Sequence, residues 1–273
     1  MAAVPVTAQP LAPSTELSAV HAEPLVATAA PPATDLFRGL SSVLVSQEST
    51  VTGGKRHRVS RVPPAHGGGA PEEAFLYAAE AHSKACHGCL PCRALRVDVH
   101  AGGSKSAPVA LTMAKDWHYC VLPWPALLHP LCCVCAIVED WILATPAELH
   151  VGDADGAALG VVHDPPGPAF WCNGNSIVRA AGGRDVFIVG PHSLWRGLIC
   201  APCVDDVVPV FAAATGGRVA TFTRPRLTCR ELFLKTNRVV IDFEHVRDPA
   251  HRSLLFAAAL LFDHSYWSPS PNL

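Results

Sequence analysis

Short stretches in which apolar and polar residues alternate recur along most of the chain, with glycine turns between them. A period of two and turn signals about every 8–12 residues are typical of an all-β sandwich or barrel. The Asn173-Gly174-Asn175 run is a strong hairpin signal, because Asn-Gly accepts the positive φ angles of a type I′ turn. The segments predicted as strands are 55–59, 74–78, 95–99, 109–113, 149–151, 159–162, 170–172, 176–178, 185–189, 207–211, 219–223 and 239–243.

One stretch near the end breaks this pattern. Residues 254–262 contain no polar side chain, and they follow Asp248, which can cap a helix, and Pro249, which suits its first position. A helix that is apolar all round is buried in protein or in lipid. A span needs about 20 apolar residues, and this run is far shorter, so we expect a core helix. Its core residues are expected to be Leu254, Leu255, Phe256, Leu260, Leu261 and Phe262.

A closed barrel around that helix accounts for both patterns. Closure removes sheet edges, and the helix fills a barrel too wide for strand side chains alone. A weak helical period in 35–45, with Leu36, Leu40 and Leu44 four residues apart, predicts a second, shorter helix.

The composition of the chain and of its two terminal segments bounds the domain, its partners and the state of its cysteines. Residues 1–34 are rich in alanine and proline and predict a disordered arm, 35–268 form the barrel domain, and 269–273 are a tail. The net charge of −2 gives no general attraction to nucleic acid, which is not an expected partner. Without a recognisable secretory signal, we expect the eleven cysteines to be reduced.

Several motifs, in order and spacing, resemble those of the phospholipid scramblase family. The resemblance covers roughly 35–268, and the chain is a divergent match. Tyr77-Ala78-Ala79-Glu80 before Cys86-His87-Gly88-Cys89 is similar to the opening of that family. The further matching segments are 95–98, 129–135, 190–191, 200–207, 230–233 and 252–267, the last with its acidic residue at Asp263.

The resemblance implies a fold and a function. The fold is a tubby-like, twelve-stranded antiparallel barrel around a central C-terminal helix. The function is bidirectional movement of phospholipids between membrane leaflets, without covalent chemistry, by a peripheral or lipid-anchored protein on the cytoplasmic face of the plasma membrane. The alternatives are a non-transporting lipid- or protein-binding module on the same barrel, and a location in the cytoplasm or nucleus. Protein partners through the N-terminal arm are a further expectation.

Calcium is the cofactor that the resemblance implies. The family's acidic loop aligns with residues 235–246, and its two leading acids are replaced by Lys235 and Asn237. Calcium takes six to eight oxygen ligands, several of them carboxylates, so a lysine at the first position opposes binding. Asp242, Glu244 and Asp248 remain but lie off the pattern. We therefore expect the strand to survive and the calcium site to be lost.

The cysteines suggest two further uses. Cys132, Cys133 and Cys135 match the segment that is palmitoylated in the family, and two acyl chains anchor a protein where one does not. Buried, inert thiols are the equal alternative. Cys86 and Cys89, with Cys200 and Cys203, have zinc-like spacing. A zinc-stabilised structural protein is therefore a third hypothesis, less favoured because the pairs must meet in space.

Basic residues crowd into one short segment. Arg224, Arg226, Arg230, Lys235 and Arg238 are candidates for contact with the headgroups of an anionic phospholipid membrane. On a strand, Arg224 and Arg226 would share one face. A solvated barrel rim is the alternative explanation. The chain contains no nucleophile elbow, phosphate loop or zinc-protease motif, so we do not expect an enzyme.

Overall fold

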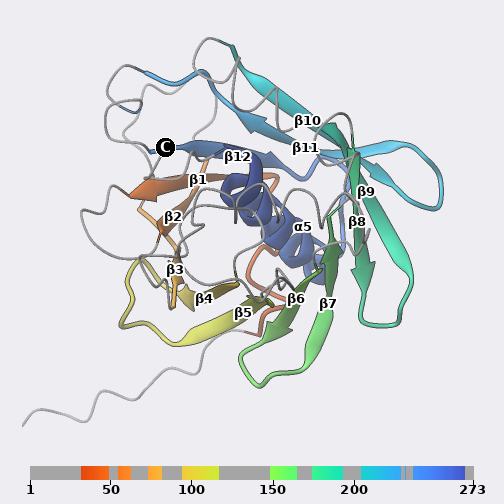
Figure 1. The fold of residues 1–273 in the computed structure, drawn as a ribbon. Coiled ribbons are helices and arrows are strands. Elements are labelled where there is room, and N and C mark those ends of the chain that lie inside the picture. Colours follow the sequence, from red (N-terminus) through yellow and green to blue (C-terminus); the bar gives the residue numbers. More distant parts are fainter. Residues whose placement is uncertain are drawn as a thin grey trace, which may run out of the picture.

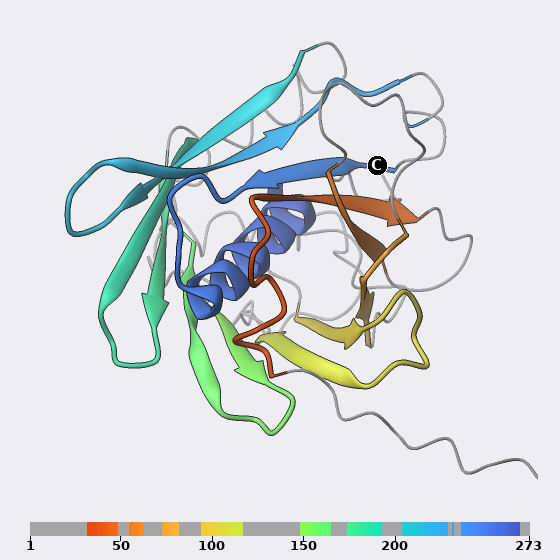
Figure 2. The same cartoon turned by 180° about the vertical axis from the view of Figure 1, so that it is seen from behind.

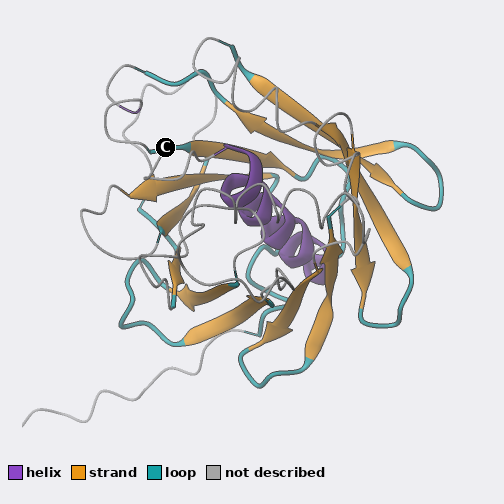
Figure 3. Cartoon of the chain, viewed as in Figure 1, coloured by secondary structure: helices purple, strands orange, loops and turns teal. Residues whose placement is uncertain are grey.

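Twelve strands form a ring around one long helix (Figure 1). The structure is a computed structural model. It describes residues 32–48, 55–62, 73–81, 94–116, 148–164, 174–192, 204–228, 231 and 236–267. The strands and the helix are distinguished by colour in Figure 3.

All twelve strands come before the helix in the chain. The strands are β1 (Ser42–Glu48), β2 (Arg56–Arg61), β3 (Leu76–Glu80), β4 (Leu95–Ala101), β5 (Val109–Lys115), β6 (Glu148–Asp153), β7 (Ala158–His163), β8 (Gly174–Ala180), β9 (Asp185–His192), β10 (Asp206–Ala212), β11 (Arg218–Arg224) and β12 (Arg238–Asp242). The α-helix α5 (Pro249–Phe262) follows, and it continues into the π-helix η3 (Asp263–Trp267).

The ring closes because the first strand pairs with the last. Each strand is antiparallel to its neighbours in the chain, and β1 completes the barrel by pairing with β12, where Val43 lies opposite Ile241. The predicted fold class, an all-β closed antiparallel barrel of twelve strands with one C-terminal apolar helix, is therefore confirmed.

Alternation along the strands gives the barrel a buried inner face. In β1, Val43 and Val45 are buried, while the residues beside them are partly exposed. Their partners on β12, Val239 and Ile241, are buried in the same way. Successive side chains of a strand point to opposite faces, so this pattern places one apolar face of each strand toward a shared core.

Helix α5 is enclosed by the ring, as the two opposite views suggest (Figures 1 and 2). Phe262 contacts Phe222 of β11 at a centroid distance of 5.9 Å and His192 of β9 at 4.4 Å. Leu254 lies against Gly160 of β7. These strand residues belong to the buried faces of well-separated strands. The contacts therefore surround the helix.

The sequence of α5 explains both its start and its burial. Asp248 is the N-cap, and its carboxylate accepts a hydrogen bond from Ala250 N at 2.9 Å. Pro249 follows at a position that needs no amide donor. All residues from 253 to 262 are buried, including the six expected core residues. Within the described ranges, no helix is long and apolar enough to cross a bilayer.

The segment before β1 packs on the start of α5. Ala33 is buried although it falls within the predicted arm, and its carbonyl oxygen accepts a hydrogen bond from Ser253 Oγ at 2.7 Å. Arg252 donates to the carbonyl oxygens of Phe37 and Leu40. The helix predicted over 35–45 is wrong: residues 33–39 form turns and Leu44 lies in β1. Residues 42–48 form a strand despite the weak helical period, because they pair with both β12 and β2.

Turn chemistry accounts for one hairpin, whereas the one turn predicted from the sequence is misplaced. The Asp153-Ala154-Asp155-Gly156 run joins β6 to β7, and Asp153 Oδ1 accepts the amides of Asp155 and Ala157. The turn predicted at 173–175 is wrong, because Gly174 and Asn175 already belong to β8, whose pairing with β9 includes Gly174.

Gly160 allows the close approach of β7, β8 and α5. A Cβ atom at this position would overlap the carbonyl oxygen of Arg179 and lie 3.0 Å from Cδ2 of Leu254. We expect Gly160→Ala to lower the free energy of unfolding by about 1–3 kcal/mol in urea titrations, because backbone must move. Gly182→Ala is the matched control, since a Cβ there meets nothing within 4 Å. Equal stability of the two variants would contradict the close packing of β7 on α5.

Candidate functional site

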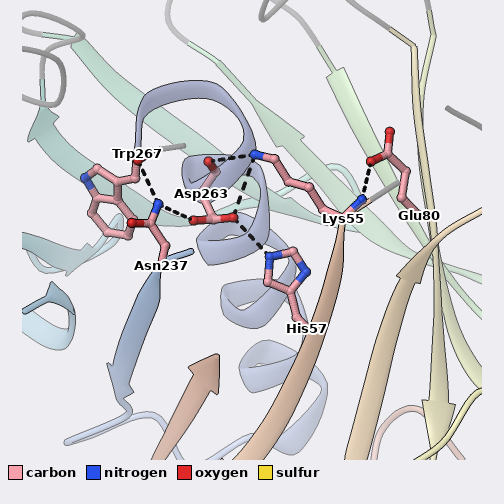
Figure 4. A network of polar contacts seen from close by, with 6 residues as sticks. All are labelled: Lys55, His57, Glu80, Asn237, Asp263 and Trp267. Carbon is pink, nitrogen blue, oxygen red and sulfur yellow. Dashed lines mark hydrogen bonds and ion pairs between the residues drawn. The ribbon is translucent and has the colours of Figure 1, made fainter. Parts of the chain in front are cut away.

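Polar side chains gather where α5 ends and η3 begins (Figure 4). The centre of the group is Asp263, whose side chain is only 2% exposed. His57 of β2 and Asn237, which precedes β12, are also buried. The completely apolar run of α5 is thus followed at once by a buried carboxylate, which is costly unless it is paired.

Three side chains from two distant segments of the chain surround this carboxylate. His57 Nε2 lies 3.0 Å from Asp263 Oδ2, and Asn237 Nδ2 donates to Oδ1 at 3.0 Å. The ammonium group of Lys55 lies 4.0 Å from Oδ2 and 3.5 Å from the main-chain oxygen of Asp263. Because an ionised carboxylate only accepts hydrogen bonds, His57 is the donor in its pair.

The network extends in two directions from this carboxylate. On one side, Glu80 of β3 accepts the Lys55 amide at 3.0 Å, which ties β3 to β2. On the other, Asn237 Nδ2 also donates to the carbonyl oxygen of Trp267 at 2.7 Å. The Trp267 indole donates to Asp206 Oδ2 at 2.8 Å. We call the set Lys55, His57, Asn237, Asp263 and Trp267 the latch.

The latch keeps Asp263 ionised. Burial by itself raises the pKa of this carboxyl. The Lys55 charge, the His57 hydrogen bond and the His57 and His264 charges together lower the pKa by more than burial raises it. The net pKa lies well below the usual range of an aspartate. A carboxyl with a depressed folded-state pKa stabilises the fold above its unfolded pKa of about 3.9, and the contribution is lost as pH falls below it.

Two more buried groups lie beside the latch. Arg224 is completely buried, and its guanidinium carbon lies 5.7 Å from the Trp267 ring centroid. Burial lowers its pKa, while Asp206 and Asp263 oppose that shift. His192 packs on Phe262, and burial lowers its pKa to about 4, against a smaller opposing effect of the Val189 backbone. His192 is therefore neutral at pH 7.

The latch is suited to hold two parts of the structure together, and not to acid–base catalysis. A general acid or base works best with a pKa near the working pH, and the pKa of Asp263 is far below it. Both carboxylate oxygens already accept hydrogen bonds from protein groups. The network joins η3 to β2 and to the segment before β12, so it holds the end of α5 against the barrel wall.

The predicted basic patch is only partly assembled. Arg226 is exposed, and Arg238 forms an ion pair with Glu231. The prediction that Arg224 and Arg226 share one face of a strand is wrong. Strand β11 ends at Arg224, which points into the buried interior and does not reach a headgroup at the surface. Arg230 and Lys235 lie outside the described residues.

The three carboxylates considered for calcium serve local structure instead. Asp242 Oδ1 accepts the amide of Glu244 at 3.0 Å, and Glu244 accepts the Thr221 hydroxyl at 3.2 Å and lies 3.6 Å from Arg218. Asp248 caps α5. A neighbouring arginine and a helix cap do not fit the oxygen-rich shell that calcium needs.

The cysteines predicted to carry acyl chains or zinc are not among the residues that the structure describes. Cys132, Cys133 and Cys135 lie outside the described residues, as do the zinc candidates Cys86, Cys89, Cys200 and Cys203. Among the residues that the structure does describe, no cluster of three or more histidine, cysteine or acidic side chains is placed to hold a metal ion.

Sequence reasoning did not predict the latch as a unit. The resemblance marks Asp263 as the acid within the closing segment, and Asn237 only as the replacement of an acid in the calcium loop. The available signal was the carboxylate that directly follows nine apolar residues, since such a group must find partners in the core. Nothing in the sequence identified those partners. No family model, curated protein or solved structure matches the chain.

Asn237 stands where the resemblance expects an acid, and the latch explains why an amide suits it. We expect Asn237→Asp to lose at least about 2 kcal/mol of unfolding free energy at pH 7, because the new carboxylate would face Asp263 and lack the two donated hydrogen bonds. The loss should shrink toward pH 5, as the new carboxyl group gains a proton. Asn237→Ala is the control, and its loss of unfolding free energy should be the same at pH 7 and pH 5. A loss for Asn237→Asp that also does not change with pH would contradict the contact between residue 237 and Asp263.

The lowered pKa of His192 predicts a second way in which the stability of the fold depends on pH. Its folded-state pKa of about 4 lies below the unfolded value of 6.5, so the unfolded state binds more protons and stability falls as pH drops from 6.5 to 4. We expect a loss of about 2 kcal/mol between pH 7.5 and pH 5 from this residue. His192→Phe should remove that part of the loss in denaturant titrations. An unchanged pH profile would show that folding does not lower the pKa of His192.

Proposed function

We propose that the chain is a phospholipid scramblase-like protein, associated with the bidirectional movement of phospholipids between membrane leaflets. The observation that carries this proposal is the closed barrel of twelve antiparallel strands around an apolar C-terminal helix. That architecture is the one implied by the motif resemblance, and the residues of the closing motif form α5 and η3.

The proposed place of action is a membrane surface. Helix α5 is buried among the strands, so the proposed contact with the membrane involves other parts of the molecule. We assign the protein to the cytoplasmic face of the plasma membrane, held peripherally or by acyl chains on Cys132, Cys133 and Cys135. Transport would need no covalent chemistry, which agrees with the ionised, hydrogen-bonded state of Asp263.

Calcium has no part in this proposal. The carboxylates of Asp242, Glu244 and Asp248 hold backbone amides, a hydroxyl and an arginine of the barrel, so binding an ion would break these contacts. The same observation favours a second candidate function, a non-transporting lipid- or protein-binding module on this barrel. The two candidates differ in whether lipid crosses the bilayer.

A reconstitution experiment separates the two functions. We expect the purified chain to speed the exchange of fluorescent phospholipids between vesicle leaflets relative to protein-free vesicles, at the same rate with calcium or with a chelator. The double variant Asp242→Asn, Glu244→Gln is the matched control and should behave as the parent does.

Each other result has a definite meaning. Exchange that requires calcium and is lost in the double variant would restore a calcium role. Vesicle binding without lipid exchange would reject transport and support the binding module. Neither binding nor exchange would reject both candidates.

A further inference from the structure

A segment that belongs to no strand covers the start of α5. Residues 32–40, which we call the strap, form turns held by hydrogen bonds within the segment. The strap lies beside α5 before the chain enters β1 (Figure 2). Ala33, Leu36 and Phe37 are buried, although the strap takes no part in the pairing of β1 with β2 and β12. Side-chain contacts, and not sheet pairing, therefore join the strap to the barrel.

The ring of Phe37 is completely buried among three other aromatic rings. Its centroid lies 5.1 Å from that of Phe256 on α5, 5.7 Å from that of Phe243 after β12, and 6.3 Å from that of Phe75 before β3. Centroid distances of about 4.5–7 Å are those of favourable aromatic pairs. The strap thus supplies one ring to an apolar site whose other rings belong to the helix and to the barrel.

A charged group holds the strap beside these rings. Arg252 Nη1 donates to the carbonyl oxygens of Phe37 and Leu40, at 2.8 and 2.6 Å, and its Nε donates to that of Val246 at 2.7 Å. The guanidinium carbon also lies 5.3 Å from the centroid of the Phe243 ring. All of these partners are neutral. Burial lowers the pKa of Arg252, because its charge is held partly away from water.

The acidic residues of this region have other partners. Asp248 caps α5, Glu244 lies beside an arginine of β11, and Asp35 pairs with an arginine of the strap itself. None of the acidic side chains that the structure describes forms an ion pair with Arg252. Arg252 is thus a partly buried cation without a counter-charge in this part of the chain. A carboxylate or phosphate would supply that charge and match the geometry of the guanidinium.

A free ligand has to compete with a strap that is tethered to the barrel. A short tether gives the strap an effective concentration on the order of millimolar. A ligand that offered only an apolar group and carbonyl oxygens would make no contact that the strap does not already make. A ligand with an apolar chain and a negative head would contact the aromatic rings and also supply the counter-charge of Arg252. An anionic single-chain lipid has both of these parts.

We propose that the strap is the internal occupant of a lipid-binding site, and that a single-chain lipid with a carboxylate or phosphate head displaces it. The chain of the lipid takes the place of the Phe37 ring, and the head pairs with Arg252. The strap then regulates when the barrel holds a lipid. The inference deepens the proposed function, on which it rests only for the choice of a lipid as the ligand.

The test measures binding of soluble dodecyl amphiphiles to the full chain by calorimetry, below the concentrations at which they form micelles. Dodecanoate and dodecyl phosphate carry the two anionic heads, and dodecyltrimethylammonium carries a cation on the same chain. We expect the anions to bind at least about tenfold more tightly than the cation, because only they pair with Arg252. Arg252→Gln should abolish this preference, whatever the absolute affinities of the variant are.

Loosening the strap should favour the lipid. We expect Phe37→Ala to bind dodecanoate about tenfold more tightly than the parent, because the strap loses its buried ring. Phe222→Ala is the matched control: it removes an equally buried ring that packs on Phe262, at the other end of α5, and should leave the affinity unchanged. Circular dichroism of each variant shows whether the barrel is folded.

Hydrogen exchange on the parent chain gives a result that does not depend on how the variants fold. The amides of Asp35, Arg38 and Leu40 are bonded within the strap. Saturating dodecanoate should speed their exchange, while the amides of β1 stay protected by pairing with β2 and β12. Dodecyltrimethylammonium at the same concentration should leave the exchange of the strap unchanged.

Three results would overturn the proposal. Equal binding of anion and cation by the parent would show that Arg252 does not select the head. Saturation with dodecanoate without faster exchange of the strap would place the lipid elsewhere. A peptide of residues 32–40 that binds Phe37→Ala, together with no binding of dodecanoate, would make this a peptide site. Lipid exchange between leaflets can fail while Arg252-dependent binding persists, so this test and that of the proposed function are distinguishable.

Discussion

A helix that is apolar on every side sets the conditions for the rest of this structure. A single layer of sheet could cover only one side of α5, and the others would remain in water. A closed ring of strands covers all sides, with buried residues such as Val43 on β1 and Phe222 on β11 facing the same core. Closure also pairs β1 with β12, which removes the exposed edges that an open sheet of twelve strands would present. Both the fold and its freedom from open edges therefore follow from the need to bury this one helix.

The latch completes this arrangement at the end where α5 leaves the apolar core. Removing one partner of a buried charge is costly, whereas an intact buried pair often adds little net stability. We infer that Asp263 contributes mainly to position. Its carboxylate meets donors from β2 and from the segment before β12, and this fixes how far α5 enters the barrel and how it is rotated. The same requirement explains Asn237, because an acid at that position would repel the carboxylate that the fold depends on.

Local pattern was enough to predict strands at β2 to β12 and the burial of residues 254–262, because period and length are properties of short segments. It failed where pairing between distant segments decides the outcome. Gly174 lies in a strand despite its Asn-Gly turn signal, and Leu44 lies in β1 despite its helical spacing. Arg224 looked like a surface residue, yet alternation along β11 and its place beside Trp267 bury it. The latch was hidden because His57 and Asp263 come from opposite ends of the domain, and no sequence spacing shows that they meet.

The pairing of β1 with β12 has a consequence for how the molecule is made. During synthesis from the N-terminus, the first strand leaves the ribosome long before its final partner exists, and α5 emerges later still. Until then the nascent chain is an open sheet with an uncovered apolar face and two free edges, a form prone to association with other chains. Contacts between residues so distant in sequence also form slowly. The barrel and its helix core can therefore be completed only after the last helix has been synthesised, and until then the apolar sheet face of the growing chain needs to be shielded from other chains.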